Sequence, residues 1–294
     1  MRKKILINAA RYVVLLLILA FGGWYVGKNY DRFAADAHFT VWNVSLIIIL
    51  NLATILVEAS RLRIMIRKLG HRMNLASALR FITITQALNH VVLKAGTFSV
   101  GYYMSKKFDF SFHSYVAFVV PYVVVMTLAS GVAGLVVTLS YLLAGCAVDM
   151  LLPTFFLAVI ISCTGFVAIA RFSYTPRFMP RILRTVISCW NEIYSDYRLI
   201  LSLIAVEIVY FTLCSIRFMV AVTMFSANVS ILSSVVVLTV GNFLRVAALV
   251  PGGLGIAEVA SGWTAALLGD DPGISALSAG LDRLVYVAFV MVFG

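Results

Sequence analysis

Val250-Pro251-Gly252-Gly253-Leu254-Gly255-Ile256-Ala257-Glu258 interrupts a long apolar part of the sequence, with Val235–Leu249 before it and Val259–Leu268 after it. Three glycines and a proline within five residues end a helix, because proline lacks the backbone N–H and glycine is entropically unfavourable there. Interrupted backbone at membrane depth persists only where protein or a water-filled cavity satisfies its polar groups. Since Arg245 and Glu258 lie beside the break, the pattern predicts a binding site. A plain glycine turn between two helices is the alternative.

The composition indicates an integral membrane protein. Of the 294 residues, 62% are hydrophobic and 12% are charged, and the mean hydropathy is +1.02. Apolar runs of spanning length recur along the whole chain and leave no polar stretch for a separate soluble domain, which is typical of a polytopic helical membrane protein. We therefore predict an all-α fold without a soluble catalytic module.

Charge and cysteine usage exclude other classes. The chain has 23 Lys and Arg against 12 Asp and Glu, a formal net charge of +11. The positive-inside rule explains most of this excess, and there is no basic stripe with interleaved aromatic residues to suggest nucleic-acid binding. The four cysteines show no metal-binding or redox spacing. No metal, cofactor or nucleic acid is therefore expected.

The positions of the basic residues predict the topology. Basic residues before the first span and in the stretch from Arg61 to Arg80 belong on the cytoplasmic side. This rule predicts about six transmembrane helices with both termini in the cytoplasm, and an amphipathic helix over Arg181–Arg198 in the inner interface. The predicted spans are Tyr12–Val26, Val41–Val57, Tyr115–Leu143, Leu151–Ala170, Leu199–Phe225 and Ile274–Phe293.

Two neighbouring apolar segments are too short to cross a membrane. As helices, Phe81–Leu93 and Thr97–Ser105 would be roughly 20 Å and roughly 14 Å long, against a hydrocarbon core of about 30 Å. Lys94-Ala95-Gly96 interrupts them, and Lys106-Lys107 follows. A re-entrant hairpin over residues 81–105 keeps these lysines and the later basic residues in the cytoplasm, whereas a single crossing would place them outside. We prefer the hairpin.

A second hairpin is predicted over residues 231–268, which contains the proline–glycine break. Its second half is also too short to cross, and Asp270 and Asp271 follow it without a basic residue, which fits a return to the outside. The chain then divides into an N-terminal anchor helix and outer loop (1–40), a first repeat (41–144), a connecting span with the interfacial helix (145–198) and a second repeat (199–294).

The two predicted repeats have opposite orientations, and a faint echo in the sequence supports an inverted repeat. Arg63 precedes Asn74 by eleven positions, and Arg217 precedes Asn228 by eleven. Inverted repeats with opposed broken helices at the midplane are typical of transporters.

Charged residues inside a membrane usually face partners or cavities. Arginine binds phosphate through paired, charge-assisted hydrogen bonds, and backbone N–H groups at the glycine break favour anions. Glu207, like the other intramembrane acids, balances the arginines or meets a cationic headgroup. Purely structural pairing is the alternative for each residue, as helix capping is for Glu258. The predicted binding residues are Asn89, Lys94, Arg217, Asn242, Arg245, Gly252, Gly253, Gly255, Glu258, Asp282 and Arg283.

Pro251–Glu258, the apolar helix after it and Arg283 resemble the membrane region of lysylphosphatidylglycerol synthases. That family includes the flippase part of multiple peptide resistance factor and stand-alone proteins. Arg61-Leu62-Arg63, Asn89 and Gly96 are similar to its N-terminal half, although Leu93–Gly96 lacks the family's Pro-Gly turn and the Glu-Arg pair often seen in the next helix is missing. The resemblance implies flippase-like handling of lipids. The synthase domain of fused members is not in this sequence, so aminoacyl transfer is not expected.

We expect a lipid transporter or flippase-like protein of a bacterial or archaeal cytoplasmic (inner) membrane. Its partners would be membrane lipids, with an anionic phospholipid or lipid-phosphate headgroup held in a polar cavity between the hairpins. A homo-oligomer is compatible with the sequence. No catalytic constellation or nucleotide site is visible, so movement is passive or ion-coupled and no enzyme is expected. The alternatives are a membrane enzyme or accessory subunit acting on lipid-linked (glyco)lipid substrates, and a structural assembly partner.

Overall fold

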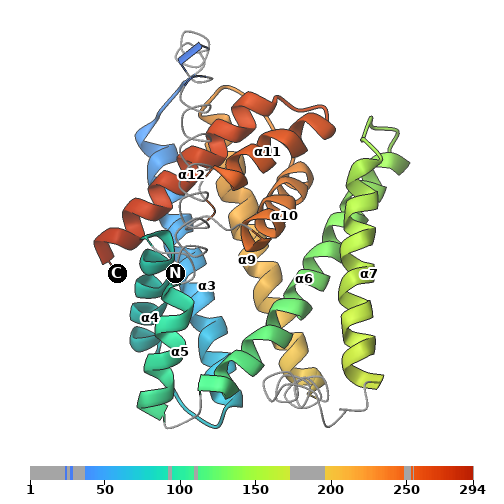
Figure 1. The fold of residues 1–294 in the computed structure, drawn as a ribbon. Helices are drawn as coiled ribbons and strands as arrows, with labels where there is room; N and C mark the ends of the chain where they lie inside the picture. Colours follow the sequence, from blue (N-terminus) through green and yellow to red (C-terminus); the bar gives the residue numbers. More distant parts are fainter. Residues whose placement is uncertain are drawn as a thin grey trace, which may run out of the picture.

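The computed structural model describes residues 24, 27–28, 37–91, 95–108, 112–172, 196–247, 253 and 255–293. This part of the chain is helical and contains no strand. Figure 1 shows it as a bundle of helices. The helices are α3 (Val41–Lys68), α4 (Leu75–Val91), α5 (Ala95–Phe108), α6 (Phe112–Leu143), α7 (Leu151–Phe172), α9 (Tyr197–Thr223), α10 (Ile231–Ala247), α11 (Ile256–Leu267) and α12 (Pro272–Phe293).

Within the described residues, five helices are long and apolar enough to cross a membrane: α3, α6 over Val119–Leu143, α7 over Leu151–Ala168, α9 and α12. They coincide with five of the six predicted spans, so the predicted polytopic all-α fold is confirmed. The predicted first span and the predicted amphipathic helix fall almost wholly outside the described residues.

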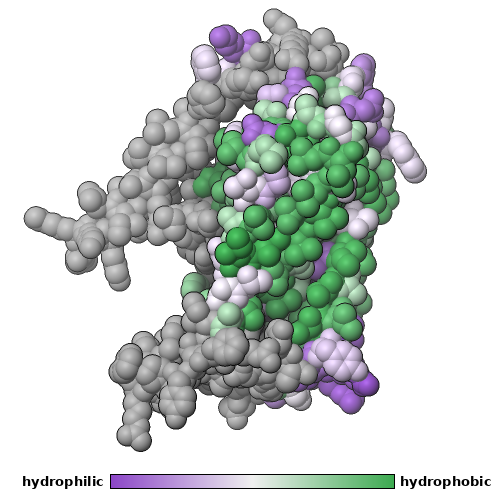
Figure 2. All heavy atoms as spheres, turned by 90° about the vertical axis from the view of Figure 1, so that its right-hand side faces the viewer, coloured by the Kyte–Doolittle hydropathy of each residue, from purple (hydrophilic) through white to green (hydrophobic). Residues whose placement is uncertain are grey.

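Apolar side chains cover the outside of the bundle between polar ends. Figure 2 shows one face as a continuous apolar band, with hydrophilic residues gathered above and below it. Large apolar side chains point outward from several helices. Such a surface is unfavourable in water, whereas the tails of a bilayer match it. Examples of these exposed side chains are Leu143, Ile161, Leu201 and Ile208.

Helix α3 continues eleven residues past its predicted end at Val57, and this corrects the position of Arg61. The sequence placed Arg61 in a cytoplasmic loop, but the structure places it inside α3. The helix continues because one of its faces is buried at helical spacing, and Arg63 on it donates from Nε to the carbonyl oxygen of Met73 at 3.1 Å. The buried residues on that face include Ala59, Leu62 and Ile66.

Both predicted interruptions separate two helices that pack against each other. Helices α4 and α5 lie side by side in the lower half of Figure 1, and α10 and α11 lie side by side in the upper half. Helix α4 follows the lower end of α3, while α10 follows the upper end of α9, so the two pairs point in opposite directions. Whether each pair turns back within a bilayer stays a prediction.

The first pair differs from the prediction at its start and at its break. Helix α4 begins at Leu75 rather than Phe81, because Asn74 Oδ1 accepts the backbone N–H of Ser77 at 2.8 Å and caps the helix. Gly96 was placed in the break but belongs to α5. It packs so closely on α4 that a Cβ would overlap the carbonyl oxygen of Thr85. The link between the helices is residues 92–94, outside the described residues.

The first two helices of each predicted repeat match at the same spacing. Helix α3 begins at residue 41 and α9 at residue 197, which is 156 positions later. Helix α4 begins at residue 75 and α10 at residue 231, again 156 later, and both have 17 residues. The capping side chains repeat as well. Each accepts the backbone N–H three residues on, and they are Thr40 and Asp196 in one pair and Asn74 and Ser230 in the other.

Packing between the two predicted repeats follows the same correspondence, in which α3 matches α9, α4 matches α10 and α6 matches α12. Helix α4 packs against α12 as its counterpart α10 packs against α6, and α3 contacts α12 as α9 contacts α6. Helices α3 and α9 are antiparallel, since Lys68 pairs with Asp196 at 2.9 Å and the N–H of His38 donates to the Met224 carbonyl at 2.7 Å. We interpret these matches as the predicted inverted repeat. Its spacing of 156 positions is two longer than the 154 positions between Arg63 and Arg217, which the sequence had matched with each other.

Beyond the interruption in each repeat, equivalent residues are 161 positions apart: α5 begins at residue 95 and α11 at residue 256. Residues 92–94 separate α4 from α5, whereas residues 248–255 separate α10 from α11, which is five residues more. Gly101 of α5 lies tightly against α6, and Gly262 of α11, 161 positions later, lies tightly against α12. The α10–α11 pair therefore has five more residues in its link, around Pro251–Gly255, than the α4–α5 pair has.

Candidate functional site

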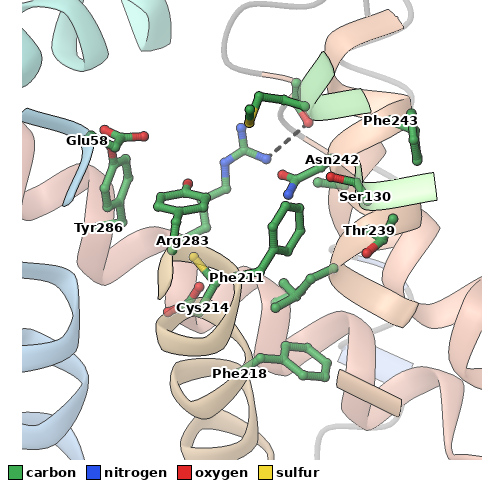
Figure 3. Close-up of a pocket in the computed structure, with 18 of the residues that line it drawn as sticks. Glu58, Ser130, Phe211, Cys214, Phe218, Thr239, Asn242, Phe243, Arg283 and Tyr286 are labelled. Atoms are coloured by element: carbon green, nitrogen blue, oxygen red, sulfur yellow. Dashed lines mark hydrogen bonds between the residues drawn. The ribbon is translucent and has the colours of Figure 1, made fainter. Parts of the chain in front are cut away.

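A cavity of about 410 Å³ lies between the repeats. Side chains from α3, α4, α6, α9, α10, α11 and α12 line it. Figure 3 shows Arg283 reaching into this space between Tyr286 and Asn242, with Ser130 on the far side. The lining combines ionised, amide, hydroxyl and aromatic groups, which is unusual for the middle of an apolar bundle.

Arg283 connects α12 to the proline–glycine break. Its Nη1 donates to the carbonyl oxygen of Gly253 and to Glu258 Oε1, both at 3.0 Å. Gly253 and Gly255 have φ of 66° and 79°, a left-handed conformation that other residues adopt only with strain. Gly255 is the N-cap of α11. The glycines thus allow the turn that brings Gly253 and Glu258 to one guanidinium.

Glu258 has two structural contacts, and a role in binding stays a prediction. It lies in the first turn of α11, where a carboxylate interacts favourably with the helix dipole. Its ion pair, however, is with Arg283 on α12, and the two side chains are only 19% and 10% exposed. Glu258 therefore joins two helices in addition to stabilising the start of its own.

Arg217 forms a second group of buried polar contacts. Its Nε pairs with Asp282 Oδ1 of α12 at 2.5 Å. Its Nη1 donates to Asn51 Oδ1 at 2.6 Å and to Thr54 Oγ1 at 3.2 Å, both on α3. The neighbours Asp282 and Arg283 thus have different partners, as adjacent residues on a helix must because they do not face each other.

Arg61 forms a third group, which the sequence reasoning missed. Its Nη1 donates to Glu207 Oε2 of α9 at 3.1 Å, and its Nη2 lies 3.7 Å from Glu58 Oε1. The guanidinium carbon also lies 5.4 Å from the ring centre of Tyr122 and 5.6 Å from that of Tyr210, within the range of cation–π attraction. The signal that could have found it is the spacing of Glu58 and Arg61, three residues apart, at the end of an apolar run.

The structure brings most of the predicted residues to one place. Asn89 and Asn242 line the cavity together with the charged groups on α9, α11 and α12. Lys94 and Gly252 lie outside the described residues, and Arg245 belongs to α10 but its side chain is not described. That these residues bind a lipid stays a prediction. The lining residues that were not predicted include Glu58, Arg61, Gln86, Tyr122, Tyr210 and Tyr286.

The fold and the cavity define the class: a multi-pass, all-α integral membrane protein in which paired charges from α3, α9, α11 and α12 line a cavity. Comparison with protein families then identifies the family. Residues 6–294 match the lysylphosphatidylglycerol synthase TM region, so the chain belongs to this family and the resemblance is confirmed over nearly its whole length. A search of curated proteins found no match.

Proposed function

We propose that the protein binds a phospholipid headgroup in the cavity and carries it across the membrane, as a lipid transporter or flippase-like protein. A volume of about 410 Å³ lies within the range of about 300–1,000 Å³ that is usual for small-molecule sites. The low end of that range suits a headgroup rather than a whole two-chain lipid. The acyl chains would then stay among the tails of the bilayer, against the apolar outer surface.

The observation that carries this proposal is the group formed by Arg283, Glu258 and Gly253. A guanidinium binds phosphate as well as carboxylate, so a headgroup phosphate can replace Glu258 at Arg283. The released carboxylate can accept a hydroxyl or an ammonium group of the same headgroup. A site of paired charges therefore suits a ligand with both phosphate and donor groups, because each buried charge keeps a partner during the exchange.

The same group connects binding to movement. Arg283 fixes the carbonyl oxygen of Gly253 in the break, so a phosphate that displaces this contact also releases the break from α12. A ligand shifts a conformational equilibrium only through contacts that differ between the two states. The contact of Arg283 with Gly253 would differ in this way, because it is present without phosphate and lost when phosphate binds. The second hairpin would then move relative to α12, as gating of one repeat against the other requires.

The test uses purified protein in liposomes of phosphatidylethanolamine and phosphatidylglycerol. A trace of phosphatidylglycerol, labelled on one acyl chain with a fluorophore that external dithionite bleaches, reports movement between the leaflets. The wild-type protein should speed the loss of protected fluorescence. Arg283→Gln and Glu258→Gln should each slow it by about 10- to 150-fold, since a hydrogen bond to a charged group contributes about 1.5–3 kcal/mol.

Arg63→Gln is the matched control, because Arg63 bonds the backbone of Met73 and does not line the cavity. Rates for the cavity variants equal to that of Arg63→Gln would refute the proposed site. Mass spectrometry of the lipids after incubation separates transport from the enzyme alternative, which requires a lipid of changed mass.

A further inference from the structure

Arg61 and Arg217 occupy equivalent places in the two repeats. They are 156 positions apart, the same spacing that separates the starts of α3 and α9. Their partners across the antiparallel α3–α9 interface, Glu207 and Asn51, are also 156 positions apart. Arg61 reaches Glu207 at 3.1 Å, and Arg217 reaches Asn51 at 2.6 Å. The two guanidinium groups therefore make equivalent contacts, each with a residue on the opposite helix.

The equivalence ends at the acidic residues. Glu207 corresponds to the neutral Asn51, and Glu58 corresponds to Cys214, also 156 positions later. Arg61 thus has two carboxylates beside it, whereas Asp282 is the one carboxylate paired with Arg217 among the described residues. With every acid ionised, the Arg61 group carries one excess negative charge and the Arg217 group carries none.

The excess charge is deeply buried. Glu58 is 5% exposed and Glu207 is 8% exposed, on helices that are long and apolar enough to span a membrane. An uncompensated charge in such surroundings is costly. Two carboxylates that share one counter-charge relieve this cost when one of them holds a proton.

The other groups that face the two carboxylates do not supply a positive charge. Tyr122 from α6 and Tyr210 from α9 lie beside Arg61. Gln86 from α4 donates its amide to both oxygens of Glu58, at 3.2 Å and 3.1 Å. These phenol and amide groups are neutral. Arg61 is therefore the only cation in contact with the pair among the described residues.

We propose that Glu58 and Glu207 share one exchangeable proton, and that this proton accompanies the headgroup across the membrane. The inference rests on the proposed function. When a proton from solution binds one carboxylate, the Arg61 group becomes neutral like the Arg217 group, so the cavity that receives the anionic phosphate at Arg283 carries one negative charge less. The proton returns to solution on the other side when the phosphate leaves. One proton moves with one anionic lipid, so the step transfers no net charge.

A pH gradient across the liposomes tests this coupling, with the labelled phosphatidylglycerol as the probe. At equal pH the wild-type protein should distribute the probe without preference. A gradient of one pH unit should enrich the probe in the leaflet on the alkaline side by up to about tenfold, because one unit is worth about 1.4 kcal/mol per proton. If the wild-type protein moves the probe but the gradient has no effect, the proton proposal is overturned and the proposed function stands.

The repeat itself supplies a variant that should fold. Glu207→Asn gives Arg61 the neutral partner that Arg217 already has in Asn51, so the contact across α3 and α9 is kept. This variant should lose the response to the gradient. The control is Asp149→Asn, because Asp149 lies outside the cavity and uses Oδ1 to accept the N–H of Leu151, which asparagine can also do. A gradient response retained by Glu207→Asn would overturn the proposal.

Infrared spectroscopy of the purified protein tests the proton without transport, and so decides the question even if the probe does not move. At neutral pH the wild-type protein should show a carbonyl band of a protonated carboxylic acid that is lost in Glu207→Asn and in Glu58→Gln. The band should remain in Asp149→Asn. Identical carbonyl bands in the wild-type protein and both glutamate variants would overturn the proposal.

Discussion

The ion pair between Arg217 and Asp282 should contribute strongly to stability, and Asp282→Asn measures it. The two side chains are 11% and 9% exposed. Removing one partner of a buried pair costs about 3–5 kcal/mol, because the remaining charge is left buried. Arg217 keeps its hydrogen bonds to Asn51 and Thr54, so we expect the lower end, about 3 kcal/mol. With roughly 2–4 °C lost per kcal/mol in chains of about 150–250 residues, the melting temperature should fall by roughly 6–12 °C.

The assay is thermal unfolding in detergent for the wild-type protein, the two single variants Asp282→Asn and Arg217→Met, and the double variant. The double variant should be more stable than the sum of the single losses predicts, because neither buried charge remains. Lys68→Met is the control, since Lys68 and Asp196 form a more exposed pair that is worth about 1 kcal/mol or less. Additive losses in the double variant, or an unchanged melting temperature for Asp282→Asn, would refute the reasoning.

Three further predictions concern single positions. Gly255→Ala should destabilise the protein by about 1–2 kcal/mol in the same thermal assay, because its φ of 79° strains any L side chain; an unchanged melting temperature would contradict it. Burial raises the pKa of Asp270, although a hydrogen bond with Ser233 opposes this shift. Ionisation of Asp270 therefore disfavours the folded state, and the free energy of unfolding falls as pH rises from the usual carboxyl pKa near 4 to the raised pKa. Asp270→Asn should therefore be more stable than the wild-type protein at pH 7 but not below pH 4. The hydrogen bond from Lys68 lowers the pKa of Asp196, so its stabilisation is present above the usual range and lost as pH falls through the lowered pKa. Asp196→Asn keeps an acceptor for the cap and should lose only that acid-dependent part, which melting curves across pH would show.

The apolar pattern of the sequence predicted the helices well where a turn follows or precedes the apolar run. Helix α7 begins at Leu151, as predicted, and α11 begins at Ile256, inside the predicted hairpin, because Gly145–Asp149 and the proline–glycine break interrupt the helical sequence. The pattern failed at α3, where a helix continues into basic sequence. Hydropathy reports which residues prefer lipid, whereas the length of this helix depends on the burial of Leu62 and Ile66 against other parts of the chain.

The partners of the buried charges could not be read from the sequence, because most of them are far apart along the chain. Arg61 and Glu207 are separated by 146 positions, and Arg217 and Asn51 by 166. The repeat could in principle have connected them, but the echo placed Arg63 rather than Arg61 opposite Arg217. At 3.6 residues per turn, a shift of two residues rotates the position by about 200° around the helix, so this error exchanges a cavity residue for one on the opposite face. The capping residues would have given the correct register, since Thr40 and Asp196, like Asn74 and Ser230, are 156 positions apart and each marks a helix start. Caps are fixed by backbone geometry, whereas a matching pair of arginines can arise by chance, so in an apolar sequence the ends of helices are the better guide to an inverted repeat.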